Sequence, residues 1–298
     1  MGARVPDDPV TGRVDAHHHL WDLAIRDQEW IDPDRMARIR RDFGPADLAA
    51  AVAGTGVRST VLVQAVAVPA ETPELLALAT GSDLVAGVVG WVDLTASDTA
   101  DRLAELASAP GGDRLVGIRH LVQGEPDPRW LCRPDVRRGL AAAAAAGLCY
   151  DLLVLPHQLP AVVETARALP QLRFVLDHLA KPPVATGELD PWAPRLRELA
   201  AAPNVAAKLS GLVTEASHDW TVTQLRPYAE VALDAFGPDR LMFGSDWPVC
   251  LLAATGYRQV LAAAEELTAG LAAAERAAVF GGTARRIYQL RSPAAPAP

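Results

Sequence analysis

The chain has 298 residues, is 50% hydrophobic, and carries a formal net charge of −8. That length suits a single α/β barrel, whose core needs no disulfide or structural metal. An acidic chain with no stripe of lysine and arginine argues against nucleic acid as a partner. The polar N-terminus and the lack of an 18-residue apolar run argue against a signal peptide and a membrane span. Cys132, Cys149 and Cys250 make no disulfide framework, so we expect a cytoplasmic protein.

Eight short apolar runs alternate with helical stretches rich in alanine, leucine and arginine. The runs are Arg13–His19, Ser59–Ala67, Leu84–Val92, Leu115–Val122, Leu148–Leu155, Leu172–Leu176, Val205–Leu209 and Leu241–Gly244. Two helices are expected at Asp135–Ala146, with Asp135 as its cap after Pro134, and at Leu159–Ala168. Such alternation predicts a (β/α)₈ TIM barrel with a parallel eight-stranded sheet.

A doubly wound open sheet is the alternative fold. It would normally carry a glycine-rich phosphate loop after its first strand, where this chain has histidines. We expect one domain over residues 12–291, with disordered tails at 1–11 and 292–298.

Polar side chains follow almost every apolar run. The C-terminal ends of the strands carry the chemistry of such barrels, so these residues are the candidates for the site. Six of the seven histidines and both lysines lie there. The candidates are Asp15, His17, His19, Gln64, Trp91, Asp93, Arg119, His120, His157, Asp177, His178, Lys181, Lys208, Ser210, Ser245, Asp246 and Trp247.

His17 and His19 are two residues apart on a strand, so both side chains point to one face and His18 to the other. Both imidazoles can then reach one metal ion, unless the three histidines are a surface cluster. His157, after the fifth run, would be a third ligand or an exposed loop histidine. Asp246 would point into the barrel mouth as metal ligand, general base or both, or else cap a helix.

His178 follows the sixth run, in Asp177-His178-Leu179-Ala180-Lys181. It could orient a water molecule or carry a proton, and the alternative is a buried histidine bonded to the backbone. Lys181 and Lys208 are the only lysines among 28 basic residues, so each is a candidate for a specific role.

These residues together resemble the amidohydrolase superfamily, whose barrels carry His-x-His on strand 1, histidines on strands 5 and 6, and aspartate on strand 8. Three segments are similar to its sugar-lactonase branch, which includes L-fuconolactonases and L-rhamnono-lactonases. They are Asp15–Trp21 (DAHHHLW), Phe174–Pro182 (FVLDHLAKP) and Phe243–Pro248 (FGSDWP). The resemblance covers nearly the whole chain, and Gly117–His120 and Gln123–Leu131 add to it.

The resemblance implies hydrolysis of a sugar-acid lactone. Two-metal members place a lysine or glutamate on strand 4, where this chain has Arg119 and His120. One divalent metal, zinc, would then be held by His17, His19, His157 and Asp246, or none would be needed. Asp246 would activate the water and His178 would position it, while Arg119 or Lys208 would stabilise the oxyanion.

The substrate would be a small lactone, and the enzyme would belong to carbohydrate metabolism. His120, Gln64 and the indoles of Trp21, Trp91 and Trp247 would bind the sugar, although the tryptophans could instead pack the rim. The alternatives are a lactonase for muconolactone or pyrone dicarboxylate, a metal-dependent decarboxylase of the same fold, and a non-catalytic binding barrel. The oligomeric state stays open, with a homodimer as one alternative.

Overall fold

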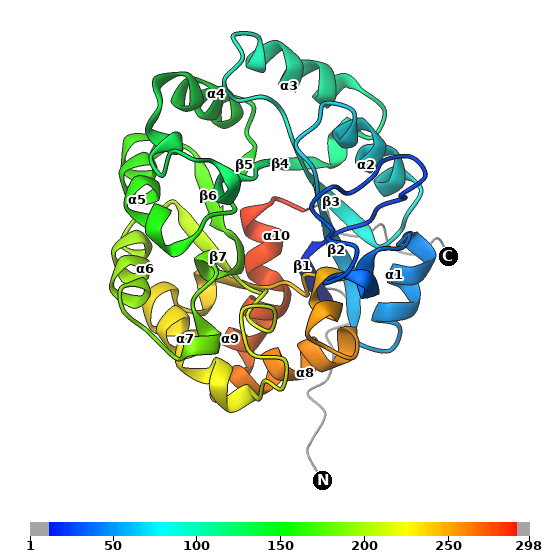
Figure 1. Ribbon diagram of the computed structural model, residues 1–298. Helices are drawn as coiled ribbons and strands as arrows, with labels where there is room; N and C mark the ends of the chain where they lie inside the picture. Colours follow the sequence, from blue (N-terminus) through cyan, green and yellow to red (C-terminus); the bar gives the residue numbers. More distant parts are fainter. Residues whose placement is uncertain (1–11, 291–298) are drawn as a thin grey trace.

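A computed structural model describes residues 12–290 of the chain (Figure 1). The two expected tails lie outside the described residues, as does residue 291 of the expected domain. Eight parallel strands pair in chain order, so the predicted barrel is confirmed. The strands are β1 (Arg13–His18), β2 (Val57–Val63), β3 (Val85–Gly90), β4 (Leu115–His120), β5 (Cys149–Leu152), β6 (Arg173–Leu176), β7 (Val205–Leu209) and β8 (Leu241–Phe243).

Most of the helices form a ring around the strands, and the last one lies across the centre of the barrel (Figure 1). The helices are α1 (Pro45–Val52), α2 (Glu71–Thr80), α3 (Thr99–Ser108), α4 (Pro134–Ala145), α5 (Leu159–Ala168), α6 (Trp192–Ala200), α7 (Val222–Phe236), α8 (Tyr257–Leu267), α9 (Ala273–Ala277) and α10 (Thr283–Ile287). Within residues 12–290, none of the helices combines the length and apolar character needed to cross a membrane.

The expected elements match the observed ones closely. The helix expected at Leu159–Ala168 is confirmed without a shift. Helix α4 begins at Pro134 rather than after a cap at Asp135, because Arg133 holds the extended N-cap position and proline takes the first helical turn. Several predicted strands extend too far, most of all β2 and β5, since the apolar run continues past Val63 and Leu152 into the loops of the barrel mouth.

The seam between β8 and β1 closes the barrel. Asp246 N donates to His17 O at 2.9 Å, and His19 N donates to Trp247 O at 2.7 Å. Both bonds lie beyond the end of β8, so they join the segments that carry the candidate metal ligands. Barrel closure therefore fixes the backbone of these ligands relative to one another.

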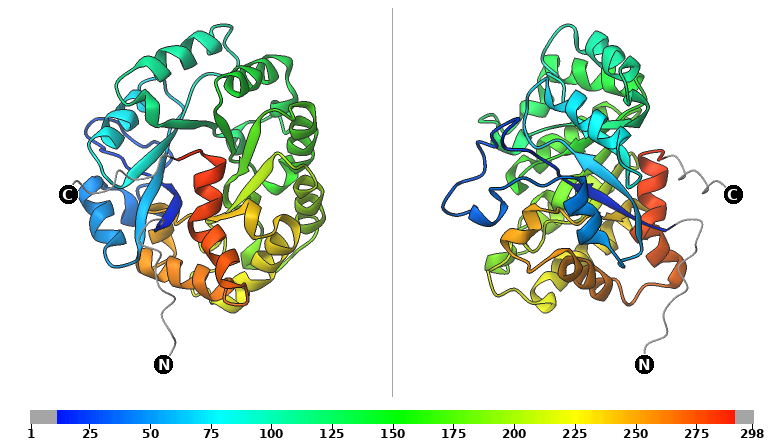
Figure 2. Two further views of the ribbon diagram at one scale, coloured as in Figure 1. Left: turned by 180° about the vertical axis from the view of Figure 1, so that it is seen from behind. Right: turned by 90° about the vertical axis from the view of Figure 1, so that its right-hand side faces the viewer.

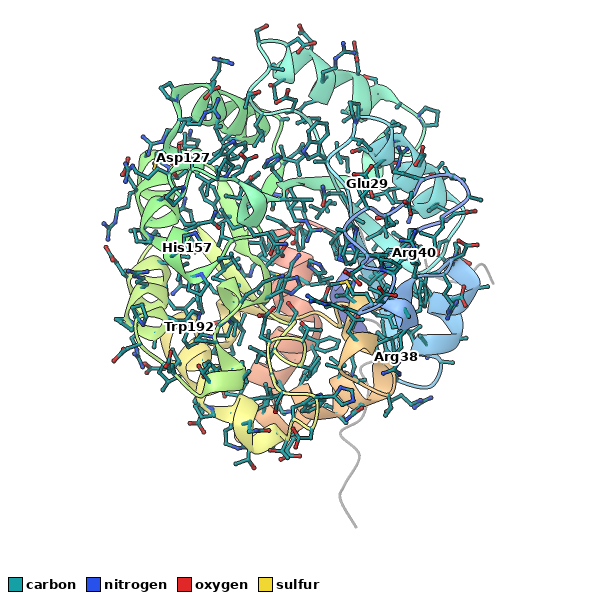
Figure 3. The ribbon with its side chains drawn as sticks, in the orientation of Figure 1. Glu29, Arg38, Arg40, Asp127, His157 and Trp192 are labelled. Atoms are coloured by element: carbon teal, nitrogen blue, oxygen red, sulfur yellow. The ribbon has the colours of Figure 1, made fainter. Side chains whose placement is uncertain are left out.

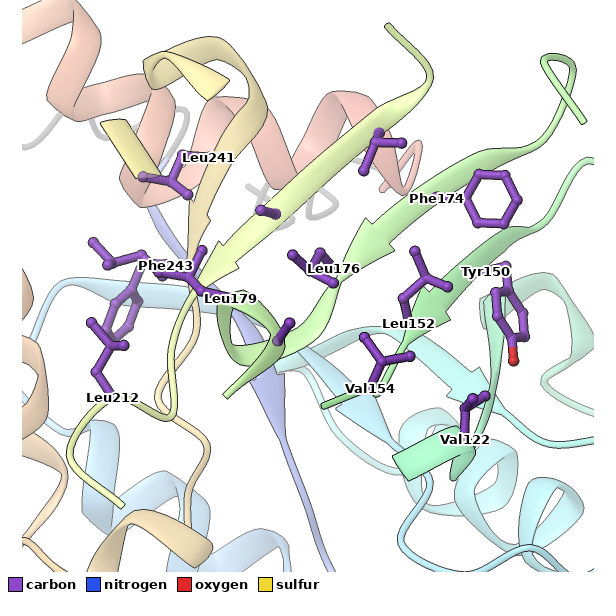
Figure 4. Close-up of a cluster of buried hydrophobic side chains, with 14 of the residues drawn as sticks. Val122, Tyr150, Leu152, Val154, Phe174, Leu176, Leu179, Leu212, Leu241 and Phe243 are labelled. Carbon is purple, nitrogen blue, oxygen red and sulfur yellow. The ribbon is translucent and has the colours of Figure 1, made fainter. Parts of the chain in front are cut away.

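Apolar side chains pack on both sides of the sheet. On the outer side, residues such as Leu152, Phe174, Leu176 and Phe243 face the helices (Figure 4). On the inner side, a smaller cluster includes Val175 and Met242 and extends to residues of the C-terminal segment. Helix α10 lies across one end of the barrel, and the long connection after β1 lies at the opposite end (Figure 2). The C-terminal segment therefore plugs the bottom of the barrel.

The carboxylate of Glu71, at the start of α2, ties that helix to the end of β2. It accepts hydrogen bonds from Ala65 N at 2.8 Å and from Val66 N at 3.1 Å. The side chain is buried, and burial raises the pKa of Glu71 to about 7 despite these amides. This carboxyl group therefore favours the folded state more when it is protonated.

The Glu71 side chain should make stability depend on pH. Its pKa is higher in the folded protein than in the unfolded chain, so its contribution is full below about pH 4 and is lost as the pH rises through 7. From pH 5 to pH 8 the free energy of unfolding should fall by about 2 kcal/mol more in the wild type than in Glu71→Gln. Urea titrations at both values test this, with the half-exposed Glu74→Gln as the matched control. If the free energy of unfolding changed equally between the two pH values in the wild type and in Glu71→Gln, the expectation would be refuted.

Candidate active site

Two layers of side chains fill the barrel below its mouth. The lower layer is apolar and includes Cys149, Val175, Ala206 and Met242. Residues two positions further along three of these strands share the same face, because side chains alternate along a strand. They are the charged residues Asp151, Asp177 and Lys208, each with no exposed surface. The site therefore stands on a layer of buried charges.

Lys208 lies at the centre of this layer. Its Nζ atom is 2.6 Å from Asp151 Oδ2, 2.9 Å from Asp177 Oδ1 and 3.0 Å from His17 Nδ1. From below, Tyr288 OH donates to the same Asp151 oxygen at 2.7 Å. Lys208 was expected to contact substrate, and the structure corrects this: it is fully buried beneath His17, with three partners around one ammonium group.

Arg119 lies beside Lys208 and is 3% exposed. Its Nη1 donates to Asp177 Oδ2 at 3.0 Å and lies 3.4 Å from His17 Nε2. Its Nε and Nη2 donate to the side-chain oxygen of Gln64 at 3.1 and 2.9 Å, and Nη2 also donates to Gln64 O. Gln64 therefore orients Arg119, and four of the five N–H groups of the guanidinium donate to Gln64 and Asp177.

His17, His19, His178 and Asp246 converge above the charged layer. The Nε2 atoms of His17 and His19 are 3.1 Å apart. Asp246 Oδ1 lies 3.7 Å from His17 Nε2, 3.6 Å from His19 Nε2 and 3.9 Å from His178 Nε2. All four residues are at most 5% exposed. The structure thus brings together four of the residues that the sequence pointed to.

The donors of His17, His19 and Asp246 fit one divalent metal ion. Their separations are close to the edge, about 3.4 Å, of a tetrahedron whose ligands lie about 2.1 Å from the ion. Val63 O can only accept a hydrogen bond, so His19 Nδ1 carries the hydrogen and Nε2 is free to ligate. Asp151, Asp177 and Asp246 against Lys208 and Arg119 leave one negative charge, which a cation would offset.

Within residues 12–290, a second metal ion has no comparable place. Asp177 forms another potential ligand group with His17 and His178. Its carboxylate, however, already lies within 3.0 Å of both Lys208 and Arg119. Two cations therefore stand where a second ion would need an uncommitted carboxylate.

An irregularity in β1 directs His17 and His19 inward. The register between β1 and β2 shifts between Asp15 and His18. As a result Ala16 joins the inner apolar cluster, while its neighbour His17 joins the site. His18 points away, with Nε2 2.9 Å from Thr60 Oγ1, as the alternation of the strand predicts. Bulges of this kind often re-aim side chains beside active sites.

Four consecutive residues with positive φ place His178. His178, Leu179, Ala180 and Lys181 have φ between 51° and 60°, a left-handed turn that costs roughly 1–2 kcal/mol per residue. Buried packing of Leu179 and the bond from Trp192 Nε1 to Leu179 O at 2.7 Å hold the turn. His178 Nδ1 lies 2.8 Å from Ser210 Oγ, so its Nε2 faces Asp246.

Gly211 is required by the ring of His178. A Cβ atom at Gly211 would lie 2.7 Å from the His178 ring, and φ is +67°. Gly211→Ala should therefore lower the free energy of unfolding by about 1–3 kcal/mol and displace His178 from Asp246. Gly187→Ala is the matched control, since φ is +74° there but the space is open. Turnover should therefore fall in Gly211→Ala and not in Gly187→Ala. Equal turnover in the two variants would contradict this expectation.

The surroundings favour the deprotonated forms of Asp246, His17 and His178, which leaves the acid charged and these two imidazoles neutral. Burial opposes the charge on Asp246, but His178 and His19 outweigh it and lower the pKa of Asp246. Burial lowers the pKa of His178 to about 4 and that of His17 well below its usual value. At neutral pH the site thus presents a carboxylate and neutral imidazoles, which suits both metal binding and proton abstraction.

His157 does not join the cluster, and its expected role as a ligand is corrected. It is exposed, in the turn Pro156–Gln158 after β5, and Figure 3 shows it near α5 in the outer ring rather than over the barrel centre. Strand β5 contributes the buried Asp151 to the interior instead. The proline before His157 starts a helical turn that leads the chain away from the mouth.

Substitution of His19 should weaken metal binding, whereas substitution of His157 should not. His19→Ala removes a donor of the cluster, so the affinity for a divalent metal should fall about tenfold or more. His157→Ala serves as the control and should bind metal like the wild type. Metal content and metal titration of the three purified proteins give the answer. Loss of metal in His157→Ala would restore that residue to the site.

Two of the expected sugar-binding tryptophans pack inside the protein. Trp21 and Trp247 are 5% and 4% exposed, and both rings meet Phe43 edge to face. Trp21 Nε1 also donates to Arg41 O at 2.7 Å. Their rings therefore shape the connection after β1, and the structure corrects their expected role as open stacking faces.

Trp91 and His120 meet at the mouth on the side of β3 and β4. Trp91 Nε1 donates to His120 Nδ1 at 3.0 Å, so Nε2 of the neutral ring carries the hydrogen towards Glu125 Oε1 at 2.7 Å. The ring of His120 stacks on Trp130 at 4.3 Å between centroids. Both residues are half-buried, and substrate binding there stays a prediction.

Three supporting residues, Asp151, Tyr257 and Tyr288, are absent from the candidates that the sequence indicated. Asp151 interrupts the apolar segment Cys149–Leu155, and a charge inside a doubly buried strand is a signal in itself. The carboxylate of Asp15 accepts hydrogen bonds from Ser245 N at 2.8 Å, from Ser245 Oγ at 2.6 Å and from Tyr257 OH at 3.0 Å. The two bonds from Ser245 join β1 to the segment before Asp246. No local pattern identifies Tyr257 as a partner of Asp15.

The comparisons with known proteins agree with this geometry. The sequence profile of the amidohydrolase family (Amidohydro_2) matches residues 14–290. The L-fucono-1,5-lactonase of Burkholderia ambifaria is 42% identical over 287 residues, covering 95% of this chain and 98% of the relative. The crystal structure of an amidohydrolase from Burkholderia multivorans with bound Zn is 42% identical, has a TM-score of 0.86 and covers 94% of this chain and 99% of its own.

A more distant structure shares the fold. A probable 2-pyrone-4,6-dicarboxylic acid hydrolase from Acinetobacter baumannii is 16% identical, with a TM-score of 0.74 over 93% of this chain and 99% of its own. At that identity the likeness concerns the barrel alone.

Proposed function

The chain belongs to the amidohydrolase family, and we propose that it hydrolyses the ester bond of a sugar-acid lactone such as L-fucono-1,5-lactone. The observation that carries the proposal is Asp246, a carboxylate whose Oδ1 faces three histidine rings at the barrel mouth. Support comes from the 42% identity to L-fucono-1,5-lactonase over nearly the full length of both chains.

We propose zinc as the metal, held by His17, His19 and Asp246, because these donors fit one divalent ion and a relative of known structure contains Zn. When bound, such an ion lowers the pKa of a coordinated water towards about 7. We also propose that the enzyme acts in carbohydrate metabolism in the cytoplasm, which suits three unpaired cysteines.

Asp246 moves the proton in the proposed reaction. Water adds to the carbonyl carbon of the lactone while the carboxylate of Asp246 accepts a proton from it. The ring C–O bond then breaks, and Asp246 returns the proton to the departing ring oxygen, which becomes a hydroxyl group. One carboxylate oxygen faces the histidines, so the other can serve this transfer. His178, held by Ser210, orients the water.

The charge layer disfavours the decarboxylase alternative. An acidic aromatic substrate would need cations with free donors at the mouth. Lys208 and Arg119 are instead committed to Asp151, Asp177 and Gln64, and the remaining lysine, Lys181, has the carboxylate of Glu215 beside it at 3.9 Å. A neutral lactone makes no such demand, so the arrangement favours lactone hydrolysis.

A screen of aldonolactones with a pH indicator tests the proposal. Acid release from L-fucono-, L-galactono- or L-rhamnono-lactone is expected, and it should fall after treatment with a chelator. No release from any of them, combined with CO₂ release from a carboxylated aromatic substrate, would overturn it.

Asp246→Asn should reduce turnover about 100-fold or more, because the amide cannot accept the proton of water. Thermal unfolding of the variant should stay close to that of the wild type, and His157→Ala is the active control. Substantial turnover in Asp246→Asn would remove Asp246 from the proton transfer.

A further inference from the structure

Hydrolysis of a lactone places negative charge on the carbonyl oxygen, and the site needs a donor for it. Both cations that the sequence suggested are occupied. Lys208 has no exposed surface and three partners within 3.0 Å. Arg119 directs its N–H groups at Gln64, Asp177 and His17. A cationic side chain with free donors would therefore have to come from elsewhere at the mouth.

Lys181 has the properties that these two cations lack. Its side chain is 26% exposed. The one partner recorded for its ammonium group within residues 12–290 is Glu215 Oε1, at 3.9 Å, which is beyond hydrogen-bond distance. Its donors are therefore free to meet a ligand.

The fold holds Lys181 close to the catalytic cluster. It ends the left-handed turn that begins at His178, and Lys181 N donates to His178 O at 2.8 Å. Its positive charge helps to lower the pKa of Asp246 and of His178. Glu215 is also within electrostatic reach of Asp246, whose charge adds to burial in raising the pKa of Glu215. The Lys181–Glu215 pair thus lies within electrostatic reach of Asp246.

A role of Lys181 in binding the substrate would explain why this strained turn is present. Four residues other than glycine with positive φ are unfavourable, and strained segments persist where their surroundings hold them. An ordinary helical turn after β6 would direct His178 and Lys181 differently. The left-handed turn delivers an imidazole and an ammonium group from one short segment to the same mouth.

We propose that Lys181 is a catalytic residue: its ammonium group donates a hydrogen bond to the carbonyl oxygen of the bound lactone and stabilises the charge that develops there. The inference rests on the proposed lactone hydrolysis. As water adds, the electron pair of the C=O bond moves to this oxygen, and it returns when the ring C–O bond breaks. Lys181 keeps its proton throughout, because Asp246 carries the proton of water.

Kinetics of Lys181→Met provide the first test. Loss of an oxyanion donor lowers kcat by about 100-fold or more, while KM should change only a few-fold. Lys181→Arg should recover at least tenfold of the lost kcat, since it keeps a charged donor. Arg226→Met, which removes a cation paired with Glu266 on the surface, is the matched control and should behave like the wild type. Urea unfolding of each variant establishes that it is folded.

A kcat in folded Lys181→Met within about threefold of the wild type would overturn the proposal. A rise in KM with unchanged kcat would also overturn it, because that result assigns Lys181 to substrate binding alone.

Acetylation of lysine gives a second test that does not need turnover. The chain has two lysines and Lys208 is fully buried, so an amine-acetylating reagent should modify Lys181 alone between residues 12 and 290. Saturating L-fuconate, the product of lactone opening, should slow this modification at least fivefold by mass spectrometry. Unprotected Lys181 would overturn the proposal. A wild type without activity on any lactone would instead refute the proposed function, and protection would still report on Lys181.

Discussion

Lys208 sits in the middle of the barrel with no contact with water, and it is neutralised by Asp151 and Asp177. Removing one partner of a buried ion pair costs about 3–5 kcal/mol, so strands β5, β6 and β7 must supply these residues together. The plug formed by the C-terminal segment closes the barrel from below, and Tyr288 adds the bond that fixes Asp151. The charge layer, which Tyr288 supports from below, thus contacts the imidazole of His17 above it through Lys208.

The site above this layer depends on two departures from regular geometry. An irregularity in β1 lets Ala16 fill the apolar interior while His17 faces the cluster. A left-handed turn after β6 brings His178 against Asp246 and leaves Lys181 at the mouth. Both are stabilised by neighbouring elements, such as Gly211, whose missing Cβ leaves room for the His178 ring. Precision in the site therefore comes from several strands at once.

The balance of charge connects the architecture to the chemistry. Buried cations hold the supporting carboxylates in place, and Asp246 remains ionised beside neutral histidines. One excess negative charge in the buried set suits a divalent metal. The cations of the layer are occupied, which leaves the partly exposed Lys181 as the cation that can meet a ligand at the mouth.

The sequence by itself determined the barrel, its eight strands and four members of the site. Doubly buried strands demand continuous apolar runs, and His17, His19, His178 and Asp246 stand at the ends of such runs. The tertiary structure alone decided which strand-end residues converge. It excluded His157, because Pro156 starts a turn that faces solvent, and it buried Lys208 beneath His17. It packed Trp21 and Trp247 against Phe43. Partners such as Asp151 and Tyr288 are 137 positions apart, and local patterns carry no information about contacts made at that distance.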